Sequence, residues 1–503
     1  MTKPGNMQPE LLSDLLDNAS KQWGHRLAIT DGSTMVTYSD LHAESSRLAD
    51  WLVSSGLCVG DRIAVAVHPS TSVISLFFGA AKAGVVFVPL HEQVTGFPLE
   101  HVLDDCRPKL LITDVSDDQR KAKIRGIETF PLSDLACITA AVPAKRPLGP
   151  ISVDPACLLY TSGTTSLPKA VVCSHQQMVF ATSAIQSVLK YRQSDVIYSA
   201  LPFSFDYGLY QVFLAAMSGA AVFLGRSVNF GASLLNDLVR SKATVLPAVP
   251  SLMEALVRML GRTAGDSLSL RLITNTGAAV SDDTVTALRA RIPGVTVQLM
   301  YGLTECKRVA IMPPDGDIRR PGACGLPLPG TEVLVVDDTG ARLEAGEVGE
   351  IVVRGPHVMA GYWNRPEQTA LRFPRRSGLF PELHTGDYGY TDEAGYLYFC
   401  GRRDDVYKER GFRISTIEIE AAAHKVTGVS GAAVLPPTAD RPAILAVVSE
   451  SPAEHVATAM RTHIEAFKIP RKCVVLSEFP FNSNGKVDRP ALARAVEEEI
   501  RVG

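Results

Sequence analysis

Apolar and polar positions along the chain follow two patterns that alternate with each other. Helical spacing of apolar residues predicts helices at 39–56 and 71–84. Short apolar runs bounded by turn residues predict buried strands at 62–67, 85–90, 110–113, 195–198, 221–224 and 243–246. This alternation predicts an α/β fold in which helices are layered on mainly parallel sheets.

The pattern changes near residue 320, where Pro and Gly increase and short alternating strands are predicted at 332–336 and 350–354. From about Gly401 a charged stretch is followed by a predicted helix at 417–426, strands and a terminal helix. At 503 residues the chain exceeds what one hydrophobic core usually supports. We therefore expect a large N-terminal domain at 1–403, whose part at 320–403 is a small β-barrel-like subdomain, and a small α+β domain at 404–503.

The composition favours a protein that works on small molecules. The formal net charge is −3 and no sustained Lys/Arg block is present, so the electrostatic footprint of a nucleic-acid binder is missing. The nine cysteines are scattered without a C-x-x-C pair, which is typical of free thiols in a reducing compartment. The sequence also lacks an apolar stretch of the ~20 residues needed to span a bilayer. We expect a cytoplasmic protein without membrane or nucleic-acid partners.

A loop rich in hydroxyls and glycine, YTSGTTSLPKA at 160–170, lies between apolar runs that read as two strands. Such a loop concentrates backbone amides and hydroxyl groups, and Gly163 permits the turn that forms an anion nest. Such a loop is suited to bind the oxygens of phosphate groups. The P-loop pattern does not fit, because Lys169 follows Pro168 and precedes Ala170. On composition alone, a flexible Ser/Thr linker is the alternative.

Five further motifs follow this loop in a fixed order: NTGAAVS at 275–281, YGLTE at 301–305, HTGDYG at 384–389, GRRDD at 401–405 and NGKVDR at 484–489. Together with the loop they resemble the AMP-forming adenylating superfamily of acyl-CoA synthetases, nonribosomal-peptide adenylation domains and luciferases. The resemblance spans residues from about 25 to 490. Attack of a carboxylate on the α-phosphate of ATP brings anions together, so cations, a metal and fixed dipoles are what this chemistry needs.

The resemblance implies how ATP and Mg²⁺ are bound. The β,γ-phosphates would be held by the loop residues Thr161, Ser162, Gly163, Thr164, Thr165 and Lys169, although Ser166 and Ala170 stand where family members usually have Gly. The remaining contacts would be Gly277, Ala278 and Ala279 along the adenine, Tyr301 stacked on it, Thr304 at the α-phosphate, Glu305 on Mg²⁺, Asp387 at the ribose hydroxyls and Arg402 near ribose and phosphate.

Lys486 aligns with the lysine that bridges the substrate carboxylate and the nucleotide oxygens during adenylation. Its mobile point charge suits an accumulating negative charge. Asp404 falls at the hinge of the family. Rotation there would replace Lys486 by the segment around Gly411-Phe412-Arg413 and open a tunnel for a thiol acceptor, so we expect the C-terminal domain to be mobile.

The stretch FSFDYGLYQ at 203–211 matches the acyl pocket of the family. Asp206 matches the aspartate that holds the substrate ammonium in members that adenylate amino acids, because a carboxylate in an apolar pocket is costly without a cation. A structural Asp bonded to nearby backbone is the alternative. The other residues expected around a modest cavity are Tyr207, Tyr210, Pro247 and Met300.

Lys307 and Arg308 follow Glu305 and Cys306, where many members have small or hydroxyl residues. One of these cations could bind a second carboxylate of the substrate, as in aspartate-like or β-amino acids. Alternatively, both point to solvent or pair with Asp206 itself.

The expected reaction is ATP-dependent adenylation of a small α- or β-amino acid, catalysed with Lys486, Thr304 and Glu305. Because no carrier domain follows Lys486, we expect a stand-alone ligase that loads the phosphopantetheine arm of a separate carrier protein, with free CoA as the alternative acceptor. An acyl-CoA ligase for small aliphatic or aryl acids is the second interpretation. A nucleotide-binding pseudoenzyme is a third, but the presence of Lys486, Glu305 and Asp387 together argues against it.

Overall fold

The computed structural model describes residues 9–138, 149–161, 168–225, 232–261, 267–375, 380–402, 406–409, 412–438, 441–464, 466, 468–480 and 487–502. The chain divides into two compact units. Unit 1 comprises residues 1–333 and 353–384, and unit 2 comprises residues 334–352 and 385–503. The expected α/β class, with a large N-terminal part and a smaller C-terminal part, is confirmed. The domain boundary at 403/404 and the mobility of the C-terminal domain stay predictions.

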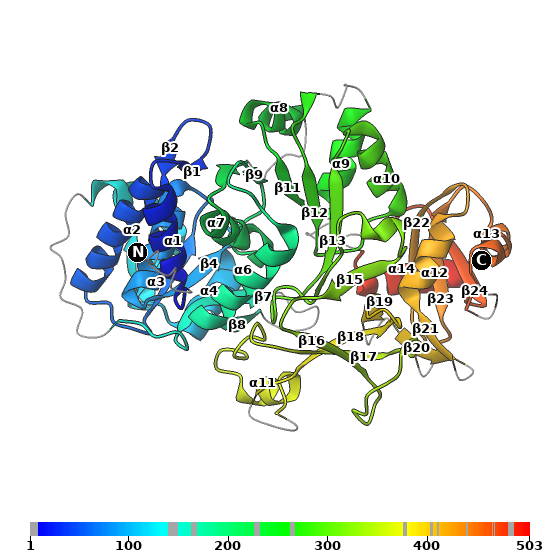
Figure 1. The fold of residues 1–503 in the computed structure, drawn as a ribbon. Helices are drawn as coiled ribbons and strands as arrows, with labels where there is room; N and C mark the ends of the chain where they lie inside the picture. Colours follow the sequence, from blue (N-terminus) through cyan, green and yellow to red (C-terminus); the bar gives the residue numbers. More distant parts are fainter. Residues whose placement is uncertain are drawn as a thin grey trace. The chain divides into compact units, whose positions relative to one another are not determined.

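Unit 1 contains two sheets (Figure 1). One is six-stranded, in the order β6 (Glu128–Phe130), β5 (Leu110–Ile112), β3 (Arg62–Ala66), β4 (Val86–Leu90), β7 (Pro155–Thr161) and β8 (Lys169–Ser174). The other runs in the order β15 (Ala323–Pro327), β14 (Ala310–Ile311), β13 (Thr296–Tyr301), β12 (Leu272–Asn275), β11 (Val245–Ala248), β9 (Val196–Ser199), β10 (Ala221–Leu224), β1 (Leu27–Thr30) and β2 (Met35–Thr37). Strands β9 to β13 are parallel, so their carboxyl ends lie at one edge.

Helices cover these sheets, and their ends carry the residues that helix ends require. Ser70 accepts a hydrogen bond from the Val73 amide at the start of α3, and Gly84 ends this helix in the left-handed region at φ 75°. The helices of unit 1 are α1 (Leu12–Trp23), α2 (Tyr38–Ser54), α3 (Thr71–Ala83), α4 (Gly96–Cys106), α5 (Ser116–Ile124), α6 (His175–Leu189), α7 (Asp206–Ser218), α8 (Ala232–Ser241), α9 (Pro250–Leu260), α10 (Asp282–Arg291) and α11 (Pro366–Arg372).

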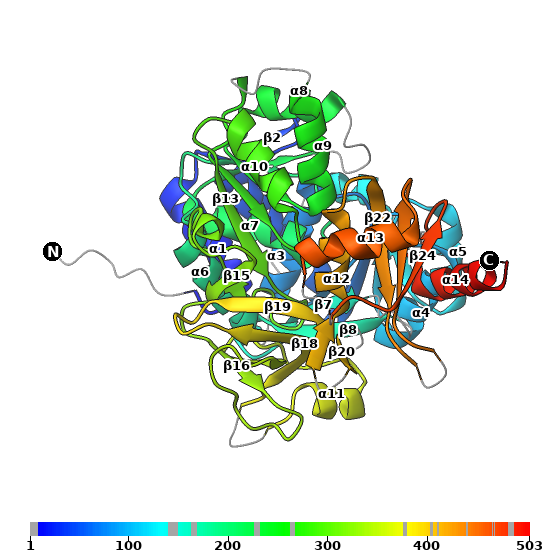
Figure 2. The same ribbon diagram turned by 90° about the vertical axis from the view of Figure 1, so that its right-hand side faces the viewer.

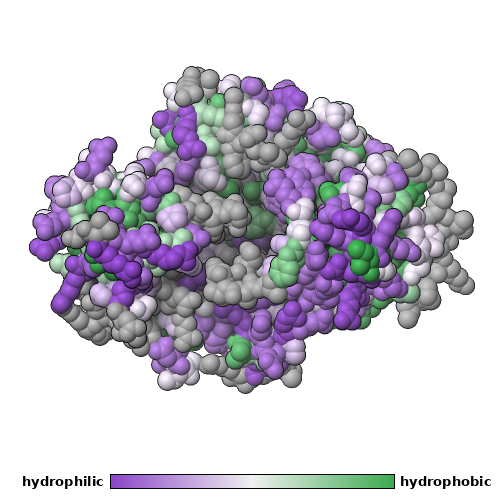
Figure 3. Space-filling model, turned by 180° about the vertical axis from the view of Figure 1, so that it is seen from behind, coloured by the Kyte–Doolittle hydropathy of each residue, from purple (hydrophilic) through white to green (hydrophobic). Residues whose placement is uncertain are grey.

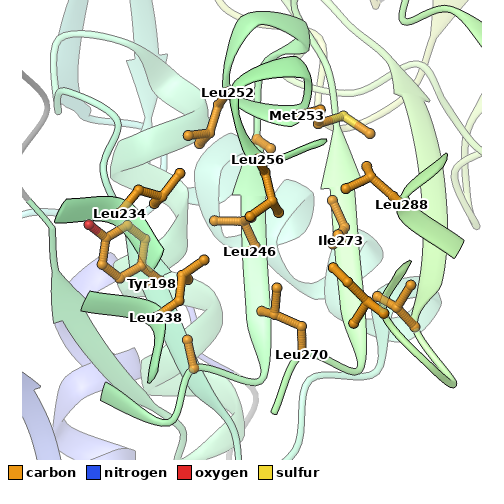
Figure 4. Close-up of a cluster of buried hydrophobic side chains, with 14 of the residues drawn as sticks. Tyr198, Leu234, Leu238, Leu246, Leu252, Met253, Leu256, Leu270, Ile273 and Leu288 are labelled. Atoms are coloured by element: carbon orange, nitrogen blue, oxygen red, sulfur yellow. The ribbon is translucent and has the colours of Figure 1, made fainter. Parts of the chain in front are cut away.

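A hydrophobic cluster joins α8, α9 and α10 to β11 and β12 (Figure 4). Leu246 and Ile273 from the strands lie among Leu234, Leu256 and Leu288 from the helices, and all five are buried. This close packing against the helices holds β11 and β12 in place, so the loops at their carboxyl ends begin at fixed positions.

Unit 2 is built from short strands with helices on one sheet (Figure 2). Three strands cross the unit boundary: β16 (Glu332–Val336), β17 (Gly349–Arg354) and β18 (Leu383–Thr391). They follow one another in this order in the sheet, and β18 is the neighbour of β19 (Leu397–Arg402). A hairpin and a three-stranded sheet follow, formed by β20 (Val406–Glu409), β21 (Phe412–Ser415), α12 (Thr416–His424), β22 (Val429–Leu435), β23 (Ile444–Ser449), α13 (Ala453–Ala459), β24 (Lys472–Leu476) and α14 (Arg489–Val502).

On the face drawn in Figure 3, most of the described residues are hydrophilic, and the hydrophobic ones form small separate patches. Within the described part of the chain, no helix is both long enough and apolar enough to cross a bilayer.

We expect His175 to make unit 1 less stable at acidic pH. This residue is fully buried and its Nδ1 accepts a bond from the Leu12 amide at 3.2 Å. Burial lowers the pKa of the imidazole from 6.5 to about 4, so the folded chain keeps it neutral while the unfolded chain takes up a proton below about pH 6.5. The free energy of unfolding should therefore fall by about 2 kcal/mol from this residue between about pH 7.5 and about pH 5. Denaturant titrations at both pH values measure the loss.

His175→Asn keeps an acceptor for the Leu12 amide but cannot titrate in this range. The loss of stability on acidification should be smaller in this variant by the same amount. An equal loss in the variant and the wild type would show that His175 is not the group responsible.

Candidate active site

The Ser/Thr/Gly loop joins β7 to β8, as the sequence predicted. Thr161 and Lys169 are paired across the two antiparallel strands, and the Thr161 hydroxyl donates to the Lys169 carbonyl at 3.3 Å. The predicted phosphate-binding residues Ser162, Gly163, Thr164 and Thr165 lie outside the described residues. The strands therefore define where the loop begins and ends.

Helix α4 holds both ends of this loop, which the sequence analysis missed. The Tyr160 hydroxyl donates to Asp105 at 2.8 Å, and His101 Nε2 lies 2.8 Å from the Pro168 carbonyl oxygen. Asp105 also pairs with Arg365 at 2.9 Å. No local pattern predicts these contacts, because the paired residues are 55 and 67 positions apart in the sequence.

Most of the other predicted residues of unit 1 gather at the carboxyl edge of β9, β11, β12 and β13. Gly277, with φ 93°, follows β12 and is exposed together with Ala278 and Ala279. Tyr301 ends β13 and pairs with Ala310. Ligands of open α/β sheets bind at this edge, because the loops that leave the strands meet there.

Glu305 lies on this edge and is almost completely buried. The Tyr362 hydroxyl donates to its Oε1 at 2.7 Å, and its carbonyl accepts from the Met359 amide at 2.9 Å. Among the described residues no group of three His, Cys, Asp or Glu side chains could hold a metal by itself. One carboxylate is nevertheless sufficient for Mg²⁺, which keeps several waters and binds through one or two carboxylates plus substrate phosphates. Glu305 therefore fits such an ion.

The residues expected around the acid include a buried ion pair. Arg308 Nη1 lies 3.3 Å from Asp206 Oδ2, and both side chains are about 5% exposed or less. Asp206 is the first residue of α7, a helix that is buried along most of its length. Of the alternatives expected for the two cations, pairing with Asp206 holds for Arg308, whereas Lys307 contacts other groups. Both cations are buried, so the alternative in which both point to solvent is wrong.

Lys307 points to a different part of the interior than Arg308. Its Nζ donates to the Thr304 carbonyl at 2.9 Å and to Cys173 Sγ at 3.3 Å, and it lies 5.9 Å from the centre of the Tyr210 ring. Burial alone would lower the pKa of this amine, but Cys173 and Asp206 outweigh it and the pKa lies above its usual value. Lys307 is therefore a charged residue held by protein groups.

Tight backbone geometry separates the two cations. Lys307 has φ 68°, in the left-handed region, and a Cβ at Gly302 would collide with the Lys307 carbonyl oxygen. The glycine of the YGLTE motif is thus needed for the turn that sends Lys307 one way and Arg308 the other.

Two polar atoms of the residues expected around the acid are not used by hydrogen bonds within the described part of the chain. The hydroxyl of Tyr210 and Nε of Arg308 are buried and have no hydrogen-bond partner among the described residues. In contrast, the Tyr207 hydroxyl donates to the Thr274 carbonyl at 2.8 Å, and the Arg308 guanidinium lies 4.8 Å from the centre of the Tyr207 ring. Of the two other expected pocket residues, Pro247 is paired with Thr274 across β11 and β12, and Met300 is buried in β13.

In unit 2, Asp387 and Arg402 face each other across β18 and β19. Arg402 Nε lies 3.8 Å from Asp387 Oδ1, and the Asp387 side chain is buried whereas that of Arg402 is exposed. Lys486 and the hinge residue Asp404 lie outside the described residues.

Comparison with known proteins agrees with this arrangement. The sequence model of the family described as AMP-binding enzyme matches residues 16–363. The chain belongs to the AMP-binding enzyme family. As a member it is an AMP-forming acid-thiol ligase that uses ATP, which confirms the resemblance and the enzyme class expected from the sequence.

Named relatives of this AMP-binding enzyme include both stand-alone ligases and parts of large synthetases. The L-proline--[L-prolyl-carrier protein] ligase of Streptomyces coelicolor is 30% identical, over 91% of this chain and 91% of that protein. The vanchrobactin synthetase VabF of Vibrio anguillarum is 28% identical over 98% of this chain, which spans only 18% of that protein.

Two solved structures resemble the enzyme in sequence and fold. VinN is 39% identical with a TM-score of 0.72, covering 78% of this chain and 98% of VinN, and it has also been solved in complex with L-aspartate. ATP-bound MatB from Rhodopseudomonas palustris is 30% identical with a TM-score of 0.85, covering 96% of this chain and 98% of MatB.

We expect Lys307→Met to destabilise unit 1. The substitution removes the donor to the partly buried Thr304 carbonyl and a positive charge near Asp206, so the free energy of unfolding should fall by about 1 to 3 kcal/mol. Denaturant titration at neutral pH measures this loss. Lys242→Met is the matched control, because Lys242 also has positive φ (52°) but is exposed. Equal stability of Lys307→Met and the wild type would contradict a structural role for this amine.

Proposed function

We propose that this enzyme adenylates a small amino acid that carries a second carboxylate, such as aspartate or a β-amino relative of it, and transfers it to the phosphopantetheine thiol of a separate carrier protein. The buried Asp206–Arg308 pair carries this proposal. An acid with one ammonium and a second carboxylate can engage both members of the pair. A monocarboxylic amino acid would take Asp206 and leave Arg308 without its partner.

The charge balance of the pocket supports an acidic substrate. Asp206 is the carboxylate partner of Arg308, whereas Lys307 contacts the Thr304 carbonyl and Cys173, so a substrate ammonium that engages Asp206 leaves the buried Arg308 without its counter-charge. A buried charge is costly unless it is paired. The unpartnered Arg308 Nε and Tyr210 hydroxyl offer two further donors to a carboxylate. The complex of VinN with L-aspartate is in line with this choice.

The proposed roles at the nucleotide follow from charge and position. Lys169 and the loop would hold the β,γ-phosphates, Glu305 would hold Mg²⁺, and Thr304 would contact the α-phosphate. Bound Mg²⁺ would neutralise phosphate charge while the acid attacks the α-phosphorus and pyrophosphate leaves. Tyr301 and 277–279 would accommodate adenine, and Asp387 and Arg402 the ribose. Lys486, brought by a mobile C-terminal domain hinged at Asp404, would stabilise the negative charge that accumulates.

The choice of a carrier protein as acceptor is supported by the proline-carrier-protein ligase among the relatives. Free CoA is the alternative acceptor, since the relatives also include the oxalate--CoA ligase of Arabidopsis thaliana. Offering the preformed adenylate to CoA and to a carrier protein with its phosphopantetheine arm separates the two.

The acid specificity is tested with L-aspartate, its amide L-asparagine and its des-amino analogue succinate. We expect the wild type to release pyrophosphate fastest with aspartate. Arg308→Gln should lower kcat/KM for aspartate, because the second carboxylate loses its charged partner; the fall should correspond to a loss of about 2 to 5 kcal/mol of transition-state stabilisation. The fall in kcat/KM for asparagine should be smaller. Asp206→Asn should lower kcat/KM for aspartate similarly and improve succinate relative to aspartate.

Two outcomes would contradict this assignment. If the wild type uses succinate or an aryl acid better than aspartate, Asp206 does not bind a substrate ammonium and the acyl ligase interpretation takes its place. If Arg308→Gln lowers kcat/KM for aspartate and for asparagine equally, Arg308 does not bind the second carboxylate of the substrate.

A further inference from the structure

The segment 358–363 joins two parts of the active site that are far apart in the sequence. Its backbone pairs with β8, the strand that leaves the Ser/Thr/Gly loop: the Ala360 amide donates to the Val172 carbonyl at 3.1 Å, and the Val172 amide donates to the Gly361 carbonyl at 2.9 Å. The same segment reaches Glu305 through the Met359 amide at 2.9 Å. The strand that follows the loop and the predicted metal ligand are therefore both hydrogen-bonded to this one segment.

The side chain of Tyr362 contacts a charged residue from each of these two parts of the site. Its hydroxyl donates to Glu305 Oε1 at 2.7 Å, and the Lys169 ammonium lies 3.9 Å from the centre of its ring. The ring packs edge-on against Phe373 at 5.4 Å, and Tyr362 is 5% exposed. One fixed aromatic side chain thus contacts a carboxylate through its hydroxyl and a cation through its face.

The positions of these groups show why their separation matters. Tyr362 and Glu305 are both almost completely buried, and the Lys169 ammonium lies against the face of the Tyr362 ring. A lysine and a glutamate in a poorly solvated site attract each other strongly. If they formed a direct ion pair, the ammonium would be less available to phosphate and the carboxylate less available to a metal ion.

We propose that Tyr362 is a positioning residue that stands between Lys169 and Glu305, so that the amine stays available for phosphate and the carboxylate for a divalent cation. The inference rests on the proposed roles of these two residues. Loss of the hydroxyl would release Glu305 toward Lys169, and the resulting ion pair would compete with both ligands.

Tyr362→Phe tests the hydroxyl while keeping the ring under Lys169 and the packing against Phe373. We expect the Mg²⁺ concentration needed for half-maximal pyrophosphate release to rise about 10- to 100-fold, as is usual when a partner of a metal ligand is lost. The KM for the acid should change less than about twofold, because Tyr362 contacts Glu305, Lys169 and Phe373, whereas the acid is proposed to bind elsewhere, at the Asp206–Arg308 pair. Calorimetric titration with ATP gives a second readout: the gain in affinity on adding Mg²⁺ should shrink, while AMP affinity is kept.

Tyr38→Phe is the matched control. Tyr38 is another buried tyrosine, whose hydroxyl donates to the Ala215 and Ala220 carbonyls away from the site. It should lower stability without changing the Mg²⁺ dependence. If Tyr362→Phe behaves as Tyr38→Phe does, or lowers acid, AMP and ATP affinity together, Tyr362 is only structural and the proposal is wrong.

Glu305→Gln separates this inference from the proposed function. Unchanged Mg²⁺ dependence in Glu305→Gln would remove Glu305 as a metal ligand, and the role of Tyr362 would fall with it. A large effect in Glu305→Gln together with wild-type behaviour of Tyr362→Phe would overturn the positioning role alone and leave the metal assignment standing.

Discussion

A charge buried in a protein interior must be matched by an opposite charge, and this constraint organises the active site of unit 1. Asp206 begins α7, whereas Lys307 and Arg308 follow β13 about a hundred residues later. The parallel order of β9 to β13 brings these segments to one edge, where the charges can meet. The hydrophobic cluster between these strands and helices α8 to α10 holds that edge in place. The positions of Asp206 and Arg308 therefore do not depend on their ion pair alone.

Local patterns in the sequence were sufficient to predict the elements that carry the site. The helix at 71–84 is α3, and the strands flanking the Ser/Thr/Gly loop are β7 and β8, because capping residues, apolar runs and turn residues act within a few positions of each other. The order of the motifs was enough to predict the family. Asp206 and Arg308 were recognised as candidates, and their mutual pairing was one of the alternatives considered.

Contacts between distant segments could not be read from those patterns. Tyr362 meets Glu305 across 57 residues, and His101 meets Pro168 across 67. Similarly, Lys307 and Arg308 are equivalent cations in the sequence, and only the left-handed backbone at Lys307 sends them to different partners. Such information depends on the tertiary fold, in which packing and backbone geometry decide what a side chain meets.

The position of Asp206 at the first turn of α7 also bears on how such a pocket can change during evolution. A carboxylate at a helix N-terminus interacts favourably with the helix dipole, and α7 lies buried in the interior of unit 1. A lineage that exchanges Asp206 to accept a different acid therefore weakens a helix of the core at the same time. Drift toward new substrates should begin at Tyr210, whose buried hydroxyl has no hydrogen-bond partner among the described residues, and reach Asp206 only after other substitutions have stabilised α7.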